Sequence, residues 1–92
     1  MATTRFDIQD HLKSREEQIA YLEAAIAEDD PDFLAVALGD IARARGVSKF
    51  AEEAGISRDI IYKTFRPGGN PRLNTLSAAT KVLGLKLTLT AA

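Results

Sequence analysis

The 92-residue sequence contains no cysteine and no tryptophan, and it has one histidine and one methionine. Without cysteine there is neither a disulfide framework nor a thiolate metal site, which fits a reducing cytoplasm. His11 stands alone, and no serine or carboxylate has a recognisable catalytic spacing, so an enzyme is the least favoured class and we expect no cofactor and no metal. Apolar runs are only a few residues long, and neither a membrane span nor a secretion signal is predicted.

Length and hydrophobic content predict one small domain. Residues 1–92, with 46% hydrophobic side chains, can bury a single core of short helices. The start of the chain is ambiguous, since Phe6 and Ile8 alternate as in a strand. We favour a helical turn that is capped by Asp7 and runs toward Leu12.

Two longer helices follow, each with a clear start. Ser14 and Glu17 form a capping box, and apolar residues then recur at spacings of three and four, which predicts a helix ending near Glu28. Asp30 as a cap, followed by proline at the first helical position, predicts a second helix that stops at Gly46. The residues expected on the buried faces are Ile19, Leu22, Ile26, Phe33, Leu34, Ala37, Leu38 and Ile41.

Two short helical patterns meet at a glycine between residues 48 and 66, which is typical of a helix-turn-helix. Gly55 follows an alanine by four residues; the alanine lets two helices approach, and the glycine reaches the positive φ that ends the first helix. We expect Ser48 to cap the first of these helices and Ser57 to cap the second, which would begin at Arg58.

With Ile56, Ile61 and Phe65 in the core, the helical repeat leaves a polar stripe facing outward. Arginine can donate to two acceptors of guanine, and lysine, tyrosine and backbone N–H groups can contact phosphates, so this stripe is a candidate DNA-binding surface. An ordinary solvated helix remains the alternative for each single residue. The residues that the repeat places on this stripe are Arg58, Asp59, Tyr62, Lys63 and Arg66. Lys49 and the backbone N–H groups that follow Ser48 form a plausible phosphate clamp at the start of the first helix.

The last third of the chain contains a loop, a helix and an alternating segment. Two prolines and two glycines between residues 66 and 71 predict a loop, and no nucleotide-binding glycine motif is present. Asn74 is expected to cap a helix that Gly84 ends. Leucines at every second position from residue 85 then predict a short C-terminal strand, paired across a dimer or with another protein; an irregular tail is the alternative.

Charge is distributed unevenly, although the net charge is only −1. Residues 1–40 carry three basic and ten acidic side chains (−7), whereas residues 41–92 carry nine basic and three acidic ones (+6). The basic half is a candidate for phosphate and the acidic half for a basic partner, with simple solubility as the alternative. Arg43 and Arg45 fit either a helix C-terminus, where positive charge is favourable, or a DNA backbone contact.

Several segments match a known family. The most specific is ALGDIARARG, residues 37–46; the others are residues 21–25, 54–58, 62–63, 69–71 and 83–87. On these segments, which span most of the chain, the sequence resembles the addiction-module antidote proteins, a branch of the lambda-repressor-like (Cro and cI type) helix-turn-helix superfamily. Thr64 departs from the aliphatic residue common in such motifs, so packing of the second helix is expected to rely on Phe65.

The resemblance implies an all-α, compact five-helix domain with an extra N-terminal helix, acting as the antitoxin of a type II toxin-antitoxin pair. Such a protein neutralises a small RelE/ParE-like toxin and represses its own operon by binding double-stranded operator DNA. By this likeness the DNA-facing positions of the motif are Ser48, Lys49, Ser57, Arg58, Tyr62 and Lys63. With Asp59 and Arg66 from the outward stripe, eight residues are predicted to bind DNA. We also expect a homodimer, with recognition helices about 34 Å apart on an inverted repeat.

The acidic N-terminal half suggests where the toxin would bind, and Glu16, Glu17, Glu23 and Glu28 are the residues whose reversal to lysine tests this. Two alternatives stay open. The chain could be an interaction module whose helix-turn-helix does not bind DNA, which Asp59 among the basic residues favours because a carboxylate repels phosphate. It could also be a transcriptional repressor without a toxin partner.

Overall fold

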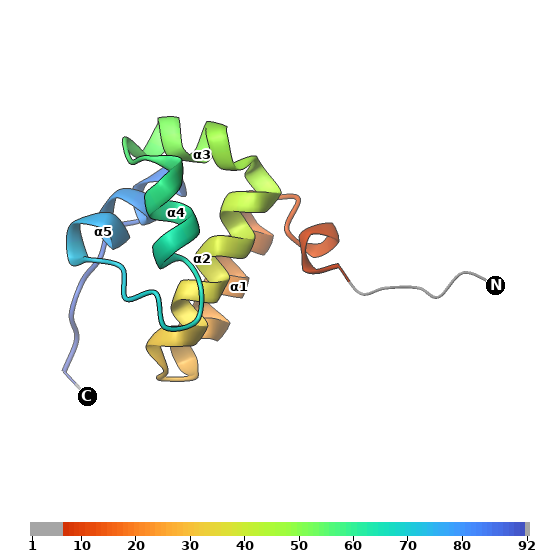
Figure 1. The fold of residues 1–92 in the computed structure, drawn as a ribbon. Coiled ribbons are helices and arrows are strands. Elements are labelled where there is room, and N and C mark those ends of the chain that lie inside the picture. The colour runs from red at the N-terminus through yellow and green to blue at the C-terminus, as the bar shows by residue number, and fades with distance from the viewer. Residues whose placement is uncertain (1–6, 92) are drawn as a thin grey trace.

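The computed structural model describes residues 7–91, and in this part of the chain every regular element is helical. A 3₁₀ turn, η1 (Ile8–His11), precedes five α-helices. These are α1 (Arg15–Ala27), α2 (Pro31–Arg45), α3 (Val47–Ala54), α4 (Arg58–Thr64) and α5 (Leu73–Val82). In Figure 1, α1 and α2 lie side by side, α3 crosses one end of this hairpin, and α4 packs in front of α2.

Helix starts in the first half of the chain follow the capping rules. Asp7 caps η1 by accepting from the backbone N–H of Gln9; the residues before it lie outside the described part of the chain. Ser14 and the third helical residue of α1 bond reciprocally, which confirms the capping box. Asp30 caps α2, with Pro31 at its first position, and Gly46 ends the helix at φ 93°. Satisfying N–H groups that have no partner within the helix stabilises each start by about 1 kcal/mol.

The core is formed by all five helices together with Leu12, which precedes α1. The rings of Phe50 and Phe65 pack edge to face, with centroids 6.4 Å apart and planes at 79°. Phe65 is 3% exposed, so packing of α4 does rely on this residue, as expected from the sequence. The largest fully buried side chains are Phe50, Leu12, Leu38, Ile41 and Leu83.

Gly39 permits a close approach between α2 and the end of α4. A β-carbon at this position would overlap the backbone carbonyl of Phe65. Glycine within a helix costs about 1 kcal/mol relative to alanine. The first glycine of the ALGDIARARG segment is therefore explained by backbone proximity between two helices.

The structure corrects four predictions. Ser48 does not cap α3, because Gly46 takes the cap position and the helix has already begun at Val47. Asn74 does not cap α5, because Arg72 holds the extended cap conformation (ψ 158°) and Leu73 is already helical.

The other two corrections concern apolar residues. Ile26 and Phe33 were expected in the core but are 56% and 49% exposed. Residues 85–90 form no strand: within residues 7–91 there is no other strand with which they could pair, and Leu89 is 97% exposed. Without a neighbouring strand, the backbone N–H and C=O groups of this leucine-alternating segment form hydrogen bonds with water instead.

Candidate nucleic-acid interface

The turn between α3 and α4 is built as the sequence predicts. Gly55 adopts a left-handed conformation (φ 72°), and its N–H donates to the carbonyls of Ala51 and Glu52. The N–H of Ile56 also donates to Ala51, which closes the end of α3. Ser57 then caps α4 by accepting from Ile60 N at 3.1 Å, so that α4 begins at Arg58.

The eight residues predicted to face DNA are all exposed. On α4, Ile61 is buried and Phe65 follows it into the core, which directs the intervening positions outward. The polar stripe therefore exists as a surface, with Ser48 and Lys49 at the start of α3 and the rest on or next to α4. The residues of this recognition stripe are Ser48, Lys49, Ser57, Arg58, Asp59, Tyr62, Lys63 and Arg66.

Within the stripe, Arg58 and Tyr62 form a pair one helical turn apart. The guanidinium of Arg58 donates to the Tyr62 hydroxyl at 3.3 Å and lies 5.8 Å from the centre of its ring. The hydrogen bond to Tyr62 raises the pKa of Arg58. The pair orders two long side chains before any partner arrives, and ordering in advance lowers the entropic cost of binding.

Asp59 makes no ion pair among residues 7–91, where the ion pairs join Arg43 with Asp40 and Arg45 with Glu53. Its carboxylate therefore lies in the stripe without a neutralising arginine. The hydroxyl of Thr64 donates back to the Ile60 carbonyl at 2.6 Å, which satisfies the polar group that replaces the expected aliphatic side chain.

Sequence reasoning missed a buried polar cluster that joins α1 to α2. Asp40 is 8% exposed; one carboxylate oxygen accepts from the Tyr21 hydroxyl and the other from Arg43, both at 2.6 Å. Burial, followed by the hydrogen bond to Asp40, raises the pKa of Tyr21 to about 12. Arg43 is thus held by a carboxylate. No pattern of spacing reveals this cluster, because Asp40 looks like an ordinary polar residue in a helix.

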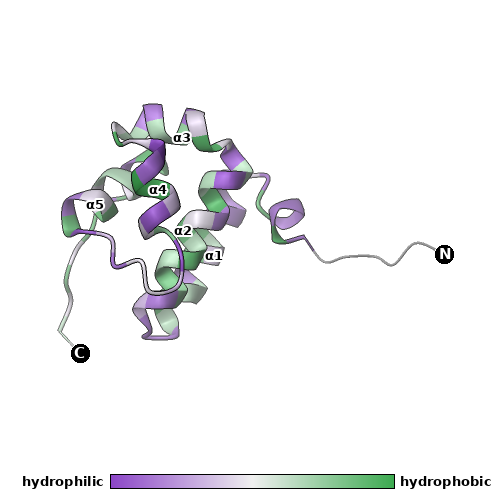
Figure 2. Cartoon of the chain, in the orientation of Figure 1, coloured by the Kyte–Doolittle hydropathy of each residue, from purple (hydrophilic) through white to green (hydrophobic). Residues whose placement is uncertain are grey.

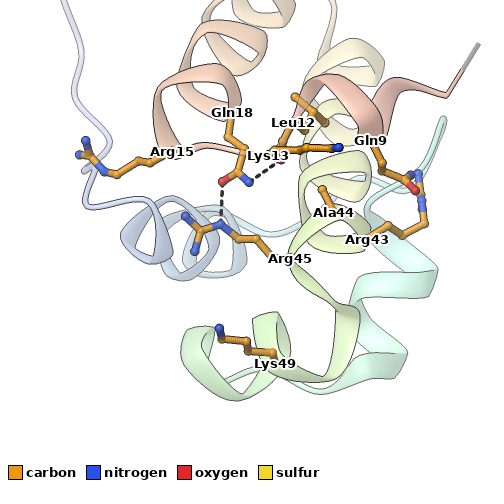
Figure 3. A pocket seen from close by; sticks show the side chains of 9 residues that line it. All are labelled: Gln9, Leu12, Lys13, Arg15, Gln18, Arg43, Ala44, Arg45 and Lys49. Atoms are coloured by element: carbon orange, nitrogen blue, oxygen red, sulfur yellow. Dashed lines mark hydrogen bonds between the residues drawn. The ribbon is translucent and has the colours of Figure 1, made fainter.

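A second missed feature is a hollow of about 440 Å³ between the N-terminal segment, α1, α2 and the start of α3. Figure 3 shows its lining. Gln18, buried at its edge, accepts from Arg45 Nε at 2.7 Å and donates to the carbonyl of Leu12 at 2.9 Å. We call this the cationic hollow, since none of the described carboxylates lines it and its charged lining residues are Lys13, Arg15, Arg43, Arg45 and Lys49.

The end of the α1–α2 hairpin presents a third surface. The exposed apolar residues Ile26 and Phe33 lie here beside acidic residues of the turn, and Figure 2 shows the turn as hydrophilic next to apolar stretches of both helices. Two shallow hollows of about 250 and 260 Å³ flank it. We call this the hairpin-end surface; the residues lining its hollows are Tyr21, Ala24, Ala25, Ile26, Glu28, Asp29, Asp30, Pro31, Phe33, Leu34 and Val36.

Among the described residues, no group of three or more histidine, cysteine, aspartate or glutamate side chains could hold a metal ion. No helix within residues 7–91 combines the length and apolar character needed to cross a bilayer.

Comparison with known proteins gives a family. A family model described as "Probable addiction module antidote protein" matches residues 2–91. An uncharacterised protein of Haemophilus influenzae (strain Rd) is 44% identical over 81 residues, which cover 88% of this chain and 84% of that protein. No solved structure matches. The family match extends over almost the whole chain and includes α3, α4 and their turn, so the chain belongs to the family of probable addiction module antidote proteins.

Proposed function

We propose that this protein is the antitoxin of a type II toxin-antitoxin module, a non-enzymatic cytoplasmic protein with two binding activities. It binds and neutralises a small basic toxin of the RelE/ParE-like kind, and it represses its own operon by binding operator DNA. Membership of the antidote family supports the antitoxin role. The RelE/ParE-like fold of the toxin, the binding of operator DNA and the assembly into a homodimer are further parts of this proposal.

The observation that carries the DNA-binding part is the construction of α3, α4 and their turn. A left-handed glycine ends α3, a serine caps α4, and buried Ile61 and Phe65 fix which side of α4 faces solvent. We propose that this unit acts as a lambda-repressor-like helix-turn-helix, with α4 in the major groove. Arg58 and Lys63 then reach base edges and phosphates, while Ser48, Lys49 and the N–H groups at the start of α3 contact the backbone.

The test is binding of the purified protein to its own upstream DNA at two salt concentrations, beside Arg58→Ala and Lys63→Ala variants. We expect sequence-specific binding that weakens at high salt and is lost or reduced in both variants. Arg58→Ala should lose discrimination between sites by about 1 to 3 kcal/mol, the range for a good bidentate contact with a base. Lys81→Ala, an exposed change on α5, is the matched control.

The toxin-binding part rests on the hairpin-end surface. Exposed Ile26 and Phe33 supply apolar area, and acidic residues surround them, which complements a basic partner that also offers apolar side chains. Glu17 is excluded from the test, because its carboxylate accepts from the backbone N–H groups of Ser14 and Lys13, and these bonds lower its pKa. Reversing it would unwind the start of α1.

Of the other three glutamates, only Glu28 lines the hairpin-end surface, and Glu16 lies in the first turn of α1. We therefore expect Glu28→Lys to weaken toxin binding while circular dichroism and the unfolding midpoint stay close to wild type. Glu16→Lys and Glu23→Lys then test whether the interface continues along α1. Phe33→Ser should weaken toxin binding independently of charge. Unchanged affinity in both Glu28→Lys and Phe33→Ser moves the toxin interface away from the hairpin end.

A second candidate function has one observation in its favour. Asp59 lies unneutralised in the recognition stripe, where its carboxylate would repel phosphate, and this suits an interaction module that binds toxin but not DNA. A folded protein that binds toxin yet no upstream DNA at low salt identifies this alternative. Specific DNA binding by a protein whose gene has no adjacent toxin gene identifies the remaining alternative, a transcriptional repressor without a toxin partner.

A further inference from the structure

The cationic hollow brings five basic side chains onto one surface. Its five basic residues come from different parts of the chain: Lys13 precedes α1, Arg15 begins it, Arg43 and Arg45 end α2, and Lys49 lies on α3. Within the described part of the chain, no acidic side chain lines the hollow. In Figure 3 the charged ends are spread along the hollow, with Arg15 at one side, Lys13 and Arg43 directed to the other, and Arg45 and Lys49 between them. Positive charge spread over one surface in this way favours an extended anion that lies across it.

Two of the arginines are held with their outer nitrogens available. Arg15 donates from Nε to the carbonyl of Leu83 at 2.7 Å, and Arg45 donates from Nε to Gln18, also at 2.7 Å. Gln18 is itself fixed, because it donates to the Leu12 carbonyl. Among residues 7–91, Glu53 is the one acidic residue near the terminal nitrogens of Arg45, and its distance of 3.9 Å is longer than a hydrogen bond.

The side chains of Lys13 and Lys49 are not held in the same way. Within residues 7–91, neither the Lys13 nor the Lys49 ammonium makes a hydrogen bond or ion pair. In Figure 3 the Lys49 side chain extends toward the side on which the Arg45 guanidinium lies. Arg43 is different, because Asp40 already neutralises it at 2.6 Å. The charges open to a ligand are therefore those of Lys13, Arg15, Arg45 and Lys49.

We infer that the cationic hollow binds a phosphate group, and that the nucleic-acid backbone supplies it. Planar guanidinium groups with free terminal nitrogens suit phosphate oxygens, and ammonium groups add charge without demanding geometry. Lys49 belongs both to this hollow and to the recognition stripe, which makes the hollow continuous with the proposed DNA surface. The inference rests on the proposed function and extends it: the segment before α1 and the end of α2 become part of the DNA-binding surface.

The deciding variant is Lys13→Gln, which removes one charge outside α3 and α4 and disturbs no hydrogen bond of that side chain. Its matched control is Lys86→Gln, an exposed change in the C-terminal tail. Affinity for the upstream DNA is measured at several salt concentrations. Each lost phosphate contact lowers the slope of log K against log salt by about 0.9. We expect this loss in Lys13→Gln, with equal loss of affinity for specific and unrelated DNA, and no change in Lys86→Gln.

The outcomes separate the inference from the function on which it rests. DNA binding by the wild type with an unchanged slope in Lys13→Gln overturns the inference and leaves the proposed function intact. Absence of DNA binding by the wild type refutes the DNA-binding part of the proposed function. In that case pyrophosphate is titrated at constant ionic strength while the NMR signals of Ala44, Lys49 and the Gln18 side-chain amide are followed. Saturable shifts that weaken in Lys13→Gln support a site for free phosphate compounds, and their absence overturns the site altogether.

Discussion

The side-chain amide of Gln18 and the guanidinium of Arg45 meet at 2.7 Å, although 27 residues separate them in the sequence. Gln18 is 4% exposed, and its nitrogen is used by the Leu12 carbonyl. One buried amide therefore ties the segment before α1 to the end of α2, next to the start of α3. Removing it leaves a donor and an acceptor without partners.

This pair predicts an energetic coupling. Gln18→Ala should lower the free energy of unfolding by about 1 to 3 kcal/mol, the cost of leaving buried polar groups unsatisfied. Combined with Arg45→Ala, the two losses should fall short of additivity by about 1 kcal/mol in a double-mutant cycle measured by urea denaturation. Gln9→Ala, at the same hollow but without a side-chain hydrogen bond among the described residues, is the control. Strict additivity would show that the bond contributes nothing.

The two serines of the α3–α4 unit predict opposite results. Ser57 caps α4, so Ser57→Ala should reduce stability by about 1 kcal/mol. Ser48 makes no capping bond, and Ser48→Ala should change stability by less than about 0.5 kcal/mol. Both substitutions are exposed and identical in chemistry, which makes each the control for the other. Equal losses in thermal unfolding would contradict the assigned start of α3.

Tyr21 predicts a loss of stability in alkali. Its pKa in the folded protein is raised to about 12 from 10, so the folded state disfavours the phenolate. The stabilisation is complete below pH 10 and disappears as the pH rises from 10 to 12, because the unfolded chain releases this proton first. Urea midpoints measured across this range should fall in the wild type and fall less in Tyr21→Phe. Tyr62→Phe, which changes an exposed tyrosine, should behave as wild type does.

Gly39→Ala reverses the usual effect of this substitution. In an exposed helix interior alanine gains about 1 kcal/mol over glycine. At this position the added methyl group overlaps the Phe65 carbonyl, so we expect a loss of about 1 to 3 kcal/mol from overpacking. Chemical denaturation measures the sign directly. A gain in stability would mean that α2 and α4 do not approach as closely as described.

Local signals in the sequence predicted most of the helical architecture, because caps and glycine turns depend on neighbouring residues. The capping box at Ser14, the Asp30 cap, the Gly55 turn and the Ser57 cap are all confirmed. The prediction that Ser48 caps α3 is wrong because α2 and α3 are separated by Gly46 alone, which leaves no position for a separate cap residue.

Features that depend on residues far apart in the sequence could not be predicted from such local signals. The Tyr21–Asp40 bond and the cationic hollow join segments that are far apart in the sequence, so no spacing predicts them. Phe33 and Ile26 fit the helical repeat, yet they emerge where the α1–α2 hairpin extends beyond the helices that cover its other end. The eight residues of the recognition stripe are exposed, as the sequence predicts. Their contact with DNA remains a prediction.

The contact between Gly39 and the end of α4 has a genetic consequence. Its partner is the backbone carbonyl of Phe65, so no replacement of the Phe65 side chain can make room for a larger residue at position 39. Second-site suppressors of Gly39→Ala should therefore be absent from position 65. They should arise instead where the path of the chain can shift, in the loop after α4, or as globally stabilising changes elsewhere. A selection for restored antidote activity would recover this distribution without any structural measurement.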